Sequence, residues 1–215
     1  MLPFFSRLKG MVLKIQDVDI VVSGQFGAEY IKSVIEQTDN RYYLVKSRIP
    51  GATYKKLHCR LPGWKTDKGR CVKVDILVPP TLGLPNITES DIYLIGDIPV
   101  MSIFDLLVMR TQGWWDHRNS PRRDFQDKVN DDASDILALL DRARLEGVSY
   151  DEVADEYRHP QEFLDNACSL ANEFVNIYGR HQRWRALHFP VQIVARADAH
   201  HAECDIVTVR FLKGA

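Results

Sequence analysis

The segment 71–78 (CVKVDILV) constrains the fold of this chain more than any other. Apolar and polar residues alternate along it, so that Val72 and Val74 point to one side and Lys73 and Asp75 to the other. An alternation with a period of two is typical of a β-strand that places one face in a hydrophobic core. The sequence therefore predicts a central strand with charged side chains on its non-core face.

The elements around this strand indicate a mixed sheet followed by helices. Ahead of it we expect a strand at 18–22, a helix at 27–37 and a hairpin with strands at 41–46 and 54–61. After it we expect a short strand at 92–95 and helices that begin at Ser102, Asp132, Ser149 and Pro160, with a charged loop at 118–129. This order predicts an α+β fold, with a mixed sheet core and a helical C-terminal region.

The same pattern predicts three parts of the chain. We expect the α/β core at 1–100, a helical region packed on it at 101–179, and a C-terminal tail at 180–215 with an edge strand at 206–212.

The composition fits a globular protein without a membrane partner. The 28 Lys and Arg residues balance 29 Asp and Glu residues, so no global positive field exists to recruit nucleic acid or an anionic membrane. No apolar run approaches the roughly 20 residues of a membrane span. The four cysteines show no zinc-ligand spacing and suit reduced thiols. We therefore expect a cytoplasmic protein.

The first candidate for chemistry is the pair Asp17 and Asp19 at the start of the first strand. Residues two apart on a strand share a face, so the two carboxylates lie side by side and each makes ionisation of the other less favourable. A divalent cation such as Mg²⁺ relieves that repulsion. The alternative is a strand end whose acidic residues face water.

Asp75 adds a third carboxylate on the non-core face of the central strand. Placed beside Asp17 and Asp19, it would complete a two-metal site for phosphoryl transfer, as a base or as a metal ligand. The alternative is a surface carboxylate paired with Lys73. The residues alone leave both interpretations open.

Three segments together resemble a known family. These are 16–19 (QDVD), 71–77 (CVKVDIL) and 106–118 (LLVMRTQGWWDHR). They are similar to a group of fungal proteins with a nucleotidyltransferase-like fold, and more distantly to abortive-infection nucleotidyltransferases of the AbiEii type. The stretch 128–140, with Asp132 and Asp135, resembles the helix that follows the core in those proteins. The resemblance covers roughly residues 10 to 145.

This resemblance implies a nucleotidyltransferase-like core that transfers a nucleoside monophosphate from an NTP to an acceptor. The implied metal is Mg²⁺ or Mn²⁺, and the acceptor is RNA, a protein or a small molecule. The residues it assigns to the metal ions are Asp17, Asp19 and Asp75, and those it assigns to the nucleotide phosphates are Lys73, Arg110 and Arg118.

One part of the family pattern differs here. Active members place a Gly-Gly or Gly-Ser turn about a dozen residues before the first Asp, where backbone N–H groups cradle the triphosphate. The matching positions here read MLPFF at 1–5, and Pro3 has no N–H group. The expected enzyme is therefore truncated or inactive in this form, or the chain is a non-catalytic binding or interaction module on a degenerate nucleotidyltransferase fold.

Two aromatic segments complete the sequence predictions. We expect Trp114 to pack on a helix face, with the role of Arg118 left open. The segment 180–185 (RHQRWR) is expected to be a solvated helix end, and the alternative is a contact with a nucleic-acid backbone.

Overall fold

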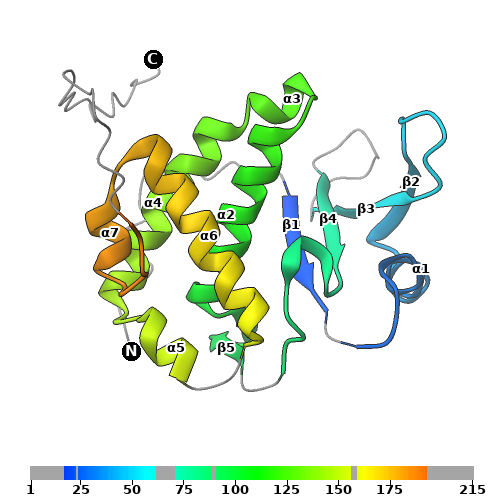
Figure 1. Cartoon of the computed structure of the whole chain (residues 1–215). Helices are drawn as coiled ribbons and strands as arrows, with labels where there is room; N and C mark the ends of the chain where they lie inside the picture. Colours follow the sequence, from blue (N-terminus) through cyan, green and yellow to red (C-terminus); the bar gives the residue numbers. More distant parts are fainter. Residues whose placement is uncertain (1–16, 23, 62–70, 89–90, 156–158, 193–215) are drawn as a thin grey trace, which may run out of the picture.

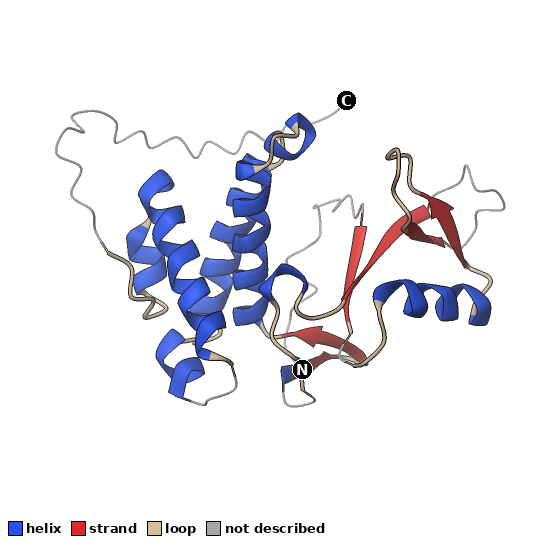
Figure 2. Cartoon of the chain, turned by 45° about the vertical axis from the view of Figure 1, so that its right-hand side comes forward, coloured by secondary structure: helices blue, strands red, loops and turns tan. Residues whose placement is uncertain are grey.

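The computed structural model describes residues 17–22, 24–61, 71–88, 91–155 and 159–192. Figures 1 and 2 show a sheet with one flanking helix on one side of the molecule and a group of helices on the other. This arrangement confirms the predicted α+β fold, in which a mixed sheet precedes a helical C-terminal region.

The elements follow one another as two successive groups. The first group consists of β1 (Asp17–Val21), α1 (Ala28–Thr38), β2 (Tyr42–Lys46), β3 (Lys55–Arg60), β4 (Cys71–Leu77), η1 (Thr81–Gly83), β5 (Ile92–Ile95) and β6 (Ile98–Met101). The second group consists of α2 (Ile103–Asn119), α3 (Arg123–Gln126), α4 (Val129–Leu145), α5 (Tyr150–Asp155), α6 (Gln161–Tyr178) and α7 (His181–Arg185).

The main sheet has the strand order β1-β4-β3-β2. The strands β2, β3 and β4 pair antiparallel, whereas β1 pairs parallel with β4. A parallel pair requires a crossover connection, which α1 and the β2–β3 hairpin supply. The predicted hairpin is thus confirmed, and the acidic strand β1 lies beside the central strand.

One face of the sheet forms a small hydrophobic core. Leu57, Val74 and Ile76 are buried in it, and Ile31 and Ile35 of α1 pack against them. Because side chains alternate along each strand, the intervening residues lie on the opposite face, which we call the open face of the sheet. The alternation predicted for 71–78 is therefore confirmed.

The helices form a second and larger core. Trp114 of α2 is completely buried and contacts Phe174 of α6, with ring centroids 5.1 Å apart. Trp184 of α7 lies 5.9 Å from the same ring and is also buried. The expectation for Trp114 is confirmed. The segment 180–185 is not simply a solvated helix end, because Trp184 packs into the helical core.

The helix boundaries follow the expected capping chemistry. The Ser102 Oγ accepts a hydrogen bond of 3.0 Å from the backbone N–H of Asp105 at the start of α2. Gly179 follows α6 with a φ of 70°, a left-handed conformation that glycine adopts without steric cost. None of the described helices is long and apolar enough to cross a membrane.

The predicted charged loop was wrong, and one strand was not predicted. The segment 118–129 is not a loop, because α2 continues to Asn119 and α3 forms at Arg123–Gln126. Phe125 anchors this short helix against His117, with ring centroids 5.0 Å apart, and the Arg122 guanidinium lies 4.0 Å from the Phe125 ring centroid. The strand predicted at 92–95 is confirmed as β5, and its antiparallel partner β6 is the strand that was not predicted. The predicted edge strand at 206–212 and the segment 1–5 lie outside the described residues.

We predict that Val74→Asp destabilises the protein by about 3 to 5 kcal/mol, because it places an uncompensated charge in the core of the sheet. Val74 is only 3% exposed. Urea unfolding measures the loss. Val45→Asp is the matched control, because Val45 is 39% exposed and its carboxylate would remain hydrated. Equal unfolding midpoints for the two variants would contradict the assignment of the core face.

Candidate functional site

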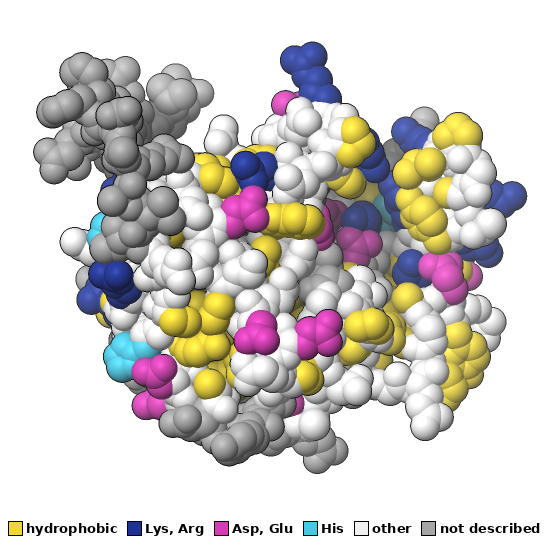
Figure 3. Space-filling view, viewed as in Figure 1, with side chains coloured by type: hydrophobic (Ala, Val, Ile, Leu, Met, Phe, Trp, Pro, Cys, Tyr) yellow, Lys and Arg dark blue, Asp and Glu magenta, His cyan; other side chains and the backbone are white. Residues whose placement is uncertain are grey.

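The pairing of β1 with β4 brings the three predicted carboxylates together. In the register of the two strands, Asp19 lies opposite Asp75 and Asp17 lies opposite Lys73. Lys73 and Asp75 lie on the open face because they alternate with the core residues of β4, and the register of the two strands places Asp17 and Asp19 on the same face. Neighbouring strands lie about 4.8 Å apart, so the Asp19 and Asp75 side chains are direct lateral neighbours. Figure 3 shows acidic and basic side chains gathered in a hollow over β4.

Lys73 is the cation of this group. Its ammonium forms an ion pair with the Asp75 carboxylate, and both side chains are about one-third exposed. Burial alone would lower the pKa of Lys73, but the hydrogen bond to Asp75 and the charges of Asp75, Asp17 and Asp19 raise it above its usual value. Lys73 therefore stays charged and neutralises part of the carboxylate group.

The surroundings of Asp19 raise the pKa of its carboxyl. Loss of solvent around its carboxyl is the main cause that raises its pKa, although the residue as a whole is exposed, and the negative charges of Asp75 and Asp17 add to the effect. The charges of Lys73 and Arg110 act in the opposite direction without cancelling it. A cation bound here would offset the repulsion between these carboxylates.

Arg110 of α2 is held by carboxylates of the helical region. Its guanidinium pairs with two acidic residues of α4, with Asp132 at 3.4 Å and with Asp135. The Asp132 side chain is only 6% exposed and also accepts or shares a hydrogen bond of 2.6 Å with His117 Nδ1. This buried carboxylate fixes Arg110 and His117 on one side of α2, and Arg110 is close enough to act on Asp19.

Arg118 is oriented differently. Its guanidinium pairs with Glu173 of α6 at 2.5 Å and lies 5.8 Å from the Trp114 ring centroid. Trp115 donates a hydrogen bond of 2.6 Å to the same glutamate. The structure therefore brings four of the six predicted site residues together on β1 and β4. Arg110 is paired with α4 and acts on Asp19 only through its charge, and Arg118 lies on the face of α2 that contacts α6.

The carboxylates of this site can bind a hard divalent cation when a substrate supplies further oxygen ligands. Among the residues the structure describes, no group of three or more His, Cys, Asp or Glu side chains forms a metal site by itself. Mg²⁺ is typically held by one or two carboxylates together with substrate phosphates. Asp19 and Asp75 are carboxylates of this kind, and Asp17 lies on the same face.

Two residues of this region were missed by sequence reasoning. Asp132 was assigned no contact, yet it holds both Arg110 and His117. His58 of β3 lies opposite Lys73 on the open face. The alternation within 55–60 (KKLHCR) is the signal that could have placed His58 on the face opposite Leu57.

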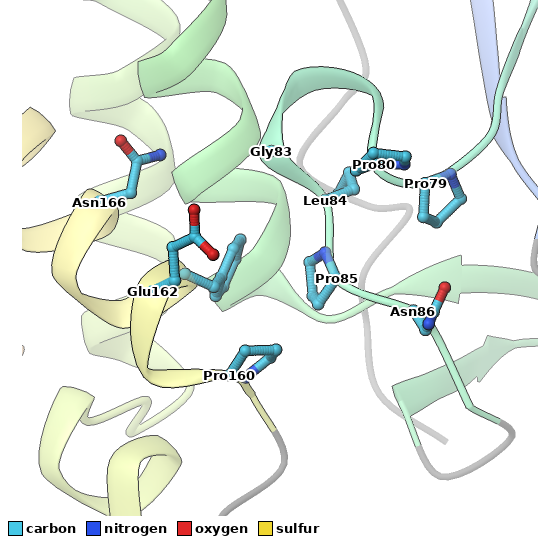
Figure 4. A pocket seen from close by; sticks show the side chains of 10 residues that line it. Pro79, Pro80, Gly83, Leu84, Pro85, Asn86, Pro160, Glu162 and Asn166 are labelled. Atoms are coloured by element: carbon cyan, nitrogen blue, oxygen red, sulfur yellow. The ribbon is translucent and has the colours of Figure 1, made fainter.

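A second concavity lies beyond the end of β4. Its volume is about 410 Å³, and it lies between the loop 79–86 and the first turns of α6 (Figure 4). Four prolines dominate its wall, and Asn86, Glu162 and Asn166 are its polar side chains. None of the six predicted site residues lines this cavity.

Comparison with known proteins gives no further guide to this site. No family model, no curated protein and no solved structure matches the chain. The resemblance to nucleotidyltransferases and the roles of the site residues therefore stay predictions.

We predict that Asp19→Asn stabilises the protein at neutral pH. A carboxyl whose pKa is raised by folding favours the protonated folded state, so its ionisation weakens the fold as the pH rises past the ordinary Asp pKa of about 3.9. Solvent screening limits the gain at pH 7 to less than about 1 kcal/mol, and the gain disappears below about pH 3.5. Chemical denaturation over this pH range measures it.

Asp97→Asn is the matched control, because Asp97 is exposed in the turn between β5 and β6. The free energy of unfolding of this variant should equal that of the wild type over the same pH range. If Asp19→Asn were less stable than the wild type at pH 7, Asp19 would be a structural partner of Lys73 rather than a repelled carboxylate.

Proposed function

We propose that this chain is a metal-dependent nucleotidyltransferase that transfers a nucleoside monophosphate from a nucleoside triphosphate to an acceptor hydroxyl. The observation that supports the proposal is the lateral pairing of Asp19 with Asp75 on adjacent parallel strands, with Asp17 on the same face. Carboxylates in such a group are suited to hold the cation of a nucleotide–metal complex.

The residues of the chain would divide the chemistry among them. Asp75 takes the proton of the attacking hydroxyl, whose oxygen forms a bond to the α-phosphorus while the bond to the bridging oxygen breaks and pyrophosphate leaves. Lys73 and Arg110 offset the negative charge on the phosphates. When bound, Mg²⁺ or Mn²⁺ would neutralise the triphosphate and lower the pKa of the acceptor hydroxyl.

A second candidate is a non-catalytic binding module on the same fold. The observation that favours it is the ion pair between Lys73 and Asp75, in which an internal ammonium already occupies one carboxylate. In this case the site binds a nucleotide or a protein partner without transferring a phosphoryl group.

We predict that an NTP with Mg²⁺ or Mn²⁺ raises the unfolding temperature of the wild type and not that of Asp19→Asn/Asp75→Asn. A ligand at about one hundred times its dissociation constant stabilises the folded state by roughly 2.7 kcal/mol, which a thermal-shift titration detects. The shift should require both the metal and the nucleotide, because the carboxylates bind the nucleotide through the metal.

The outcomes separate the two candidate functions. Asp97→Asn should keep the full shift. A metal-dependent shift together with pyrophosphate release supports the transferase, whereas a shift without release in the presence of varied acceptors supports the binding module. The absence of any shift with any NTP and either metal would refute nucleotide binding at this site.

A further inference from the structure

The open face of the sheet continues beyond the carboxylates to its far edge. The registers of the three strand pairs place Tyr43, His58, Lys73 and Asp17 in one lateral row across β2, β3, β4 and β1. Two aromatic rings thus lie at one end of a row whose other end is acidic. Because β2 is the edge strand, this end of the row is not enclosed by a further strand of the sheet.

The planar groups at this end are already stacked. The rings of Tyr43 and His58 have centroids 5.5 Å apart and an interplanar angle of 24°. The Arg60 guanidinium lies 4.3 Å from the Tyr43 ring centroid, and its Nη1 donates a hydrogen bond of 2.7 Å to the carbonyl of Asn40. We call Tyr43, His58 and Arg60 the planar cluster. All three residues are half-buried, so part of the cluster remains accessible.

The hydrophobic core does not account for this cluster. The apolar contacts of the sheet are on the opposite face, where Leu57 and Val74 pack with α1. The His58 Nδ1 is buried and has no hydrogen-bond partner among the described residues, which is unfavourable for a side chain with a purely structural role. The imidazole is therefore positioned by stacking on Tyr43.

The chemistry of the cluster matches a nucleobase. Aromatic rings on an open sheet face and guanidinium planes are surfaces on which unpaired bases stack. Three basic residues, Lys56, Arg60 and Lys73, alternate with the core residues of β3 and β4 and so lie on this face, where they attract phosphates. Within the four described strands of this sheet, the acidic residues are Asp17 and Asp19 of β1 and Asp75 of β4.

We propose that the planar cluster binds a base of a single-stranded polynucleotide, whose end is the acceptor of the transfer. This inference rests on the proposed function and names its acceptor. One strand spacing and two residues along a strand separate His58 from Asp75, a distance of about 8 Å between backbones. Lys73 lies between them, so the phosphate of one nucleotide bridges the cluster and the carboxylates.

The test measures the binding of a fluorescein-labelled single-stranded RNA of about ten nucleotides by fluorescence anisotropy. EDTA is present and NTP is left out, so that the metal site does not contribute to binding. We expect Tyr43→Ala to weaken binding roughly 5- to 100-fold, the range of one lost stacking contact, and Tyr43→Phe to bind like the wild type. Arg60→Gln, which removes the planar cation, should also weaken binding and serves if Tyr43→Ala fails to fold. Tyr93→Ala is the matched control, because Tyr93 is 52% exposed on β5.

Each outcome decides the proposal. Repeating the measurement with the same oligonucleotide as DNA shows which sugar the cluster accepts. Binding of either polynucleotide supports the proposal. RNA and DNA binding that is absent, or that Tyr43→Ala and Arg60→Gln leave unchanged, overturns it. The proposal is also overturned if Tyr43→Ala and Arg60→Gln weaken the binding of free ATP but not that of the polynucleotide, because the cluster would then bind the base of the NTP. If the metal-dependent NTP shift persists in these cases, only the acceptor is wrong and the transferase stands.

Discussion

The parallel pairing of β1 with β4 is the constraint on which the rest of the site depends. It requires the chain to leave β1, form α1 and the β2–β3 hairpin, and return alongside its starting strand. The register then sets Asp19 beside Asp75, and a slip of one residue would turn the acidic side chains of β1 to the opposite face. Burial of Val74 and Ile76 on β4 fixes which face that is. The repulsion between the Asp19 and Asp75 carboxylates is therefore a consequence of the register of the sheet.

The helical region contributes charge to the same place through a buried carboxylate. Asp132 of α4 joins this helix to α2 by contacting both Arg110 and His117. The packing of Trp114 on Phe174 fixes α2 against α6. The position of Arg110 thus depends on the packing of the helices, whereas the position of Lys73 depends only on strand β4. The two cations offset part of the negative charge, whereas burial of the Asp19 carboxyl and the charges of Asp75 and Asp17 keep the pKa of Asp19 raised.

Local patterns predicted the parts of the molecule that local forces determine. The alternation in β4 gave the correct buried face because a period of two is decisive for a half-buried strand, and the cap at Ser102 marked the start of α2. The partner strand β6 was missed because Pro99 obscures its pattern, and α3 was missed because charged residues dominate it. The orientation of Arg118 and the row from Tyr43 to Asp17 depend on helix packing and strand register, which no short segment encodes. The roles of the site residues stay predictions.

The central claim is that the carboxylates of β1 and β4 form a cation site, and paramagnetic broadening by Mn²⁺ in an amide NMR spectrum tests it most directly. The effect maps the ion onto individual residues and requires no catalytic activity. We expect small additions of Mn²⁺ with a nucleotide to broaden the amide signals of 17–21 and 73–77 first, and Mg²⁺ to restore them by competition. Broadening centred instead on the acidic residues of α4, such as Asp131 and Asp135, or spread evenly over the surface, would contradict the claim.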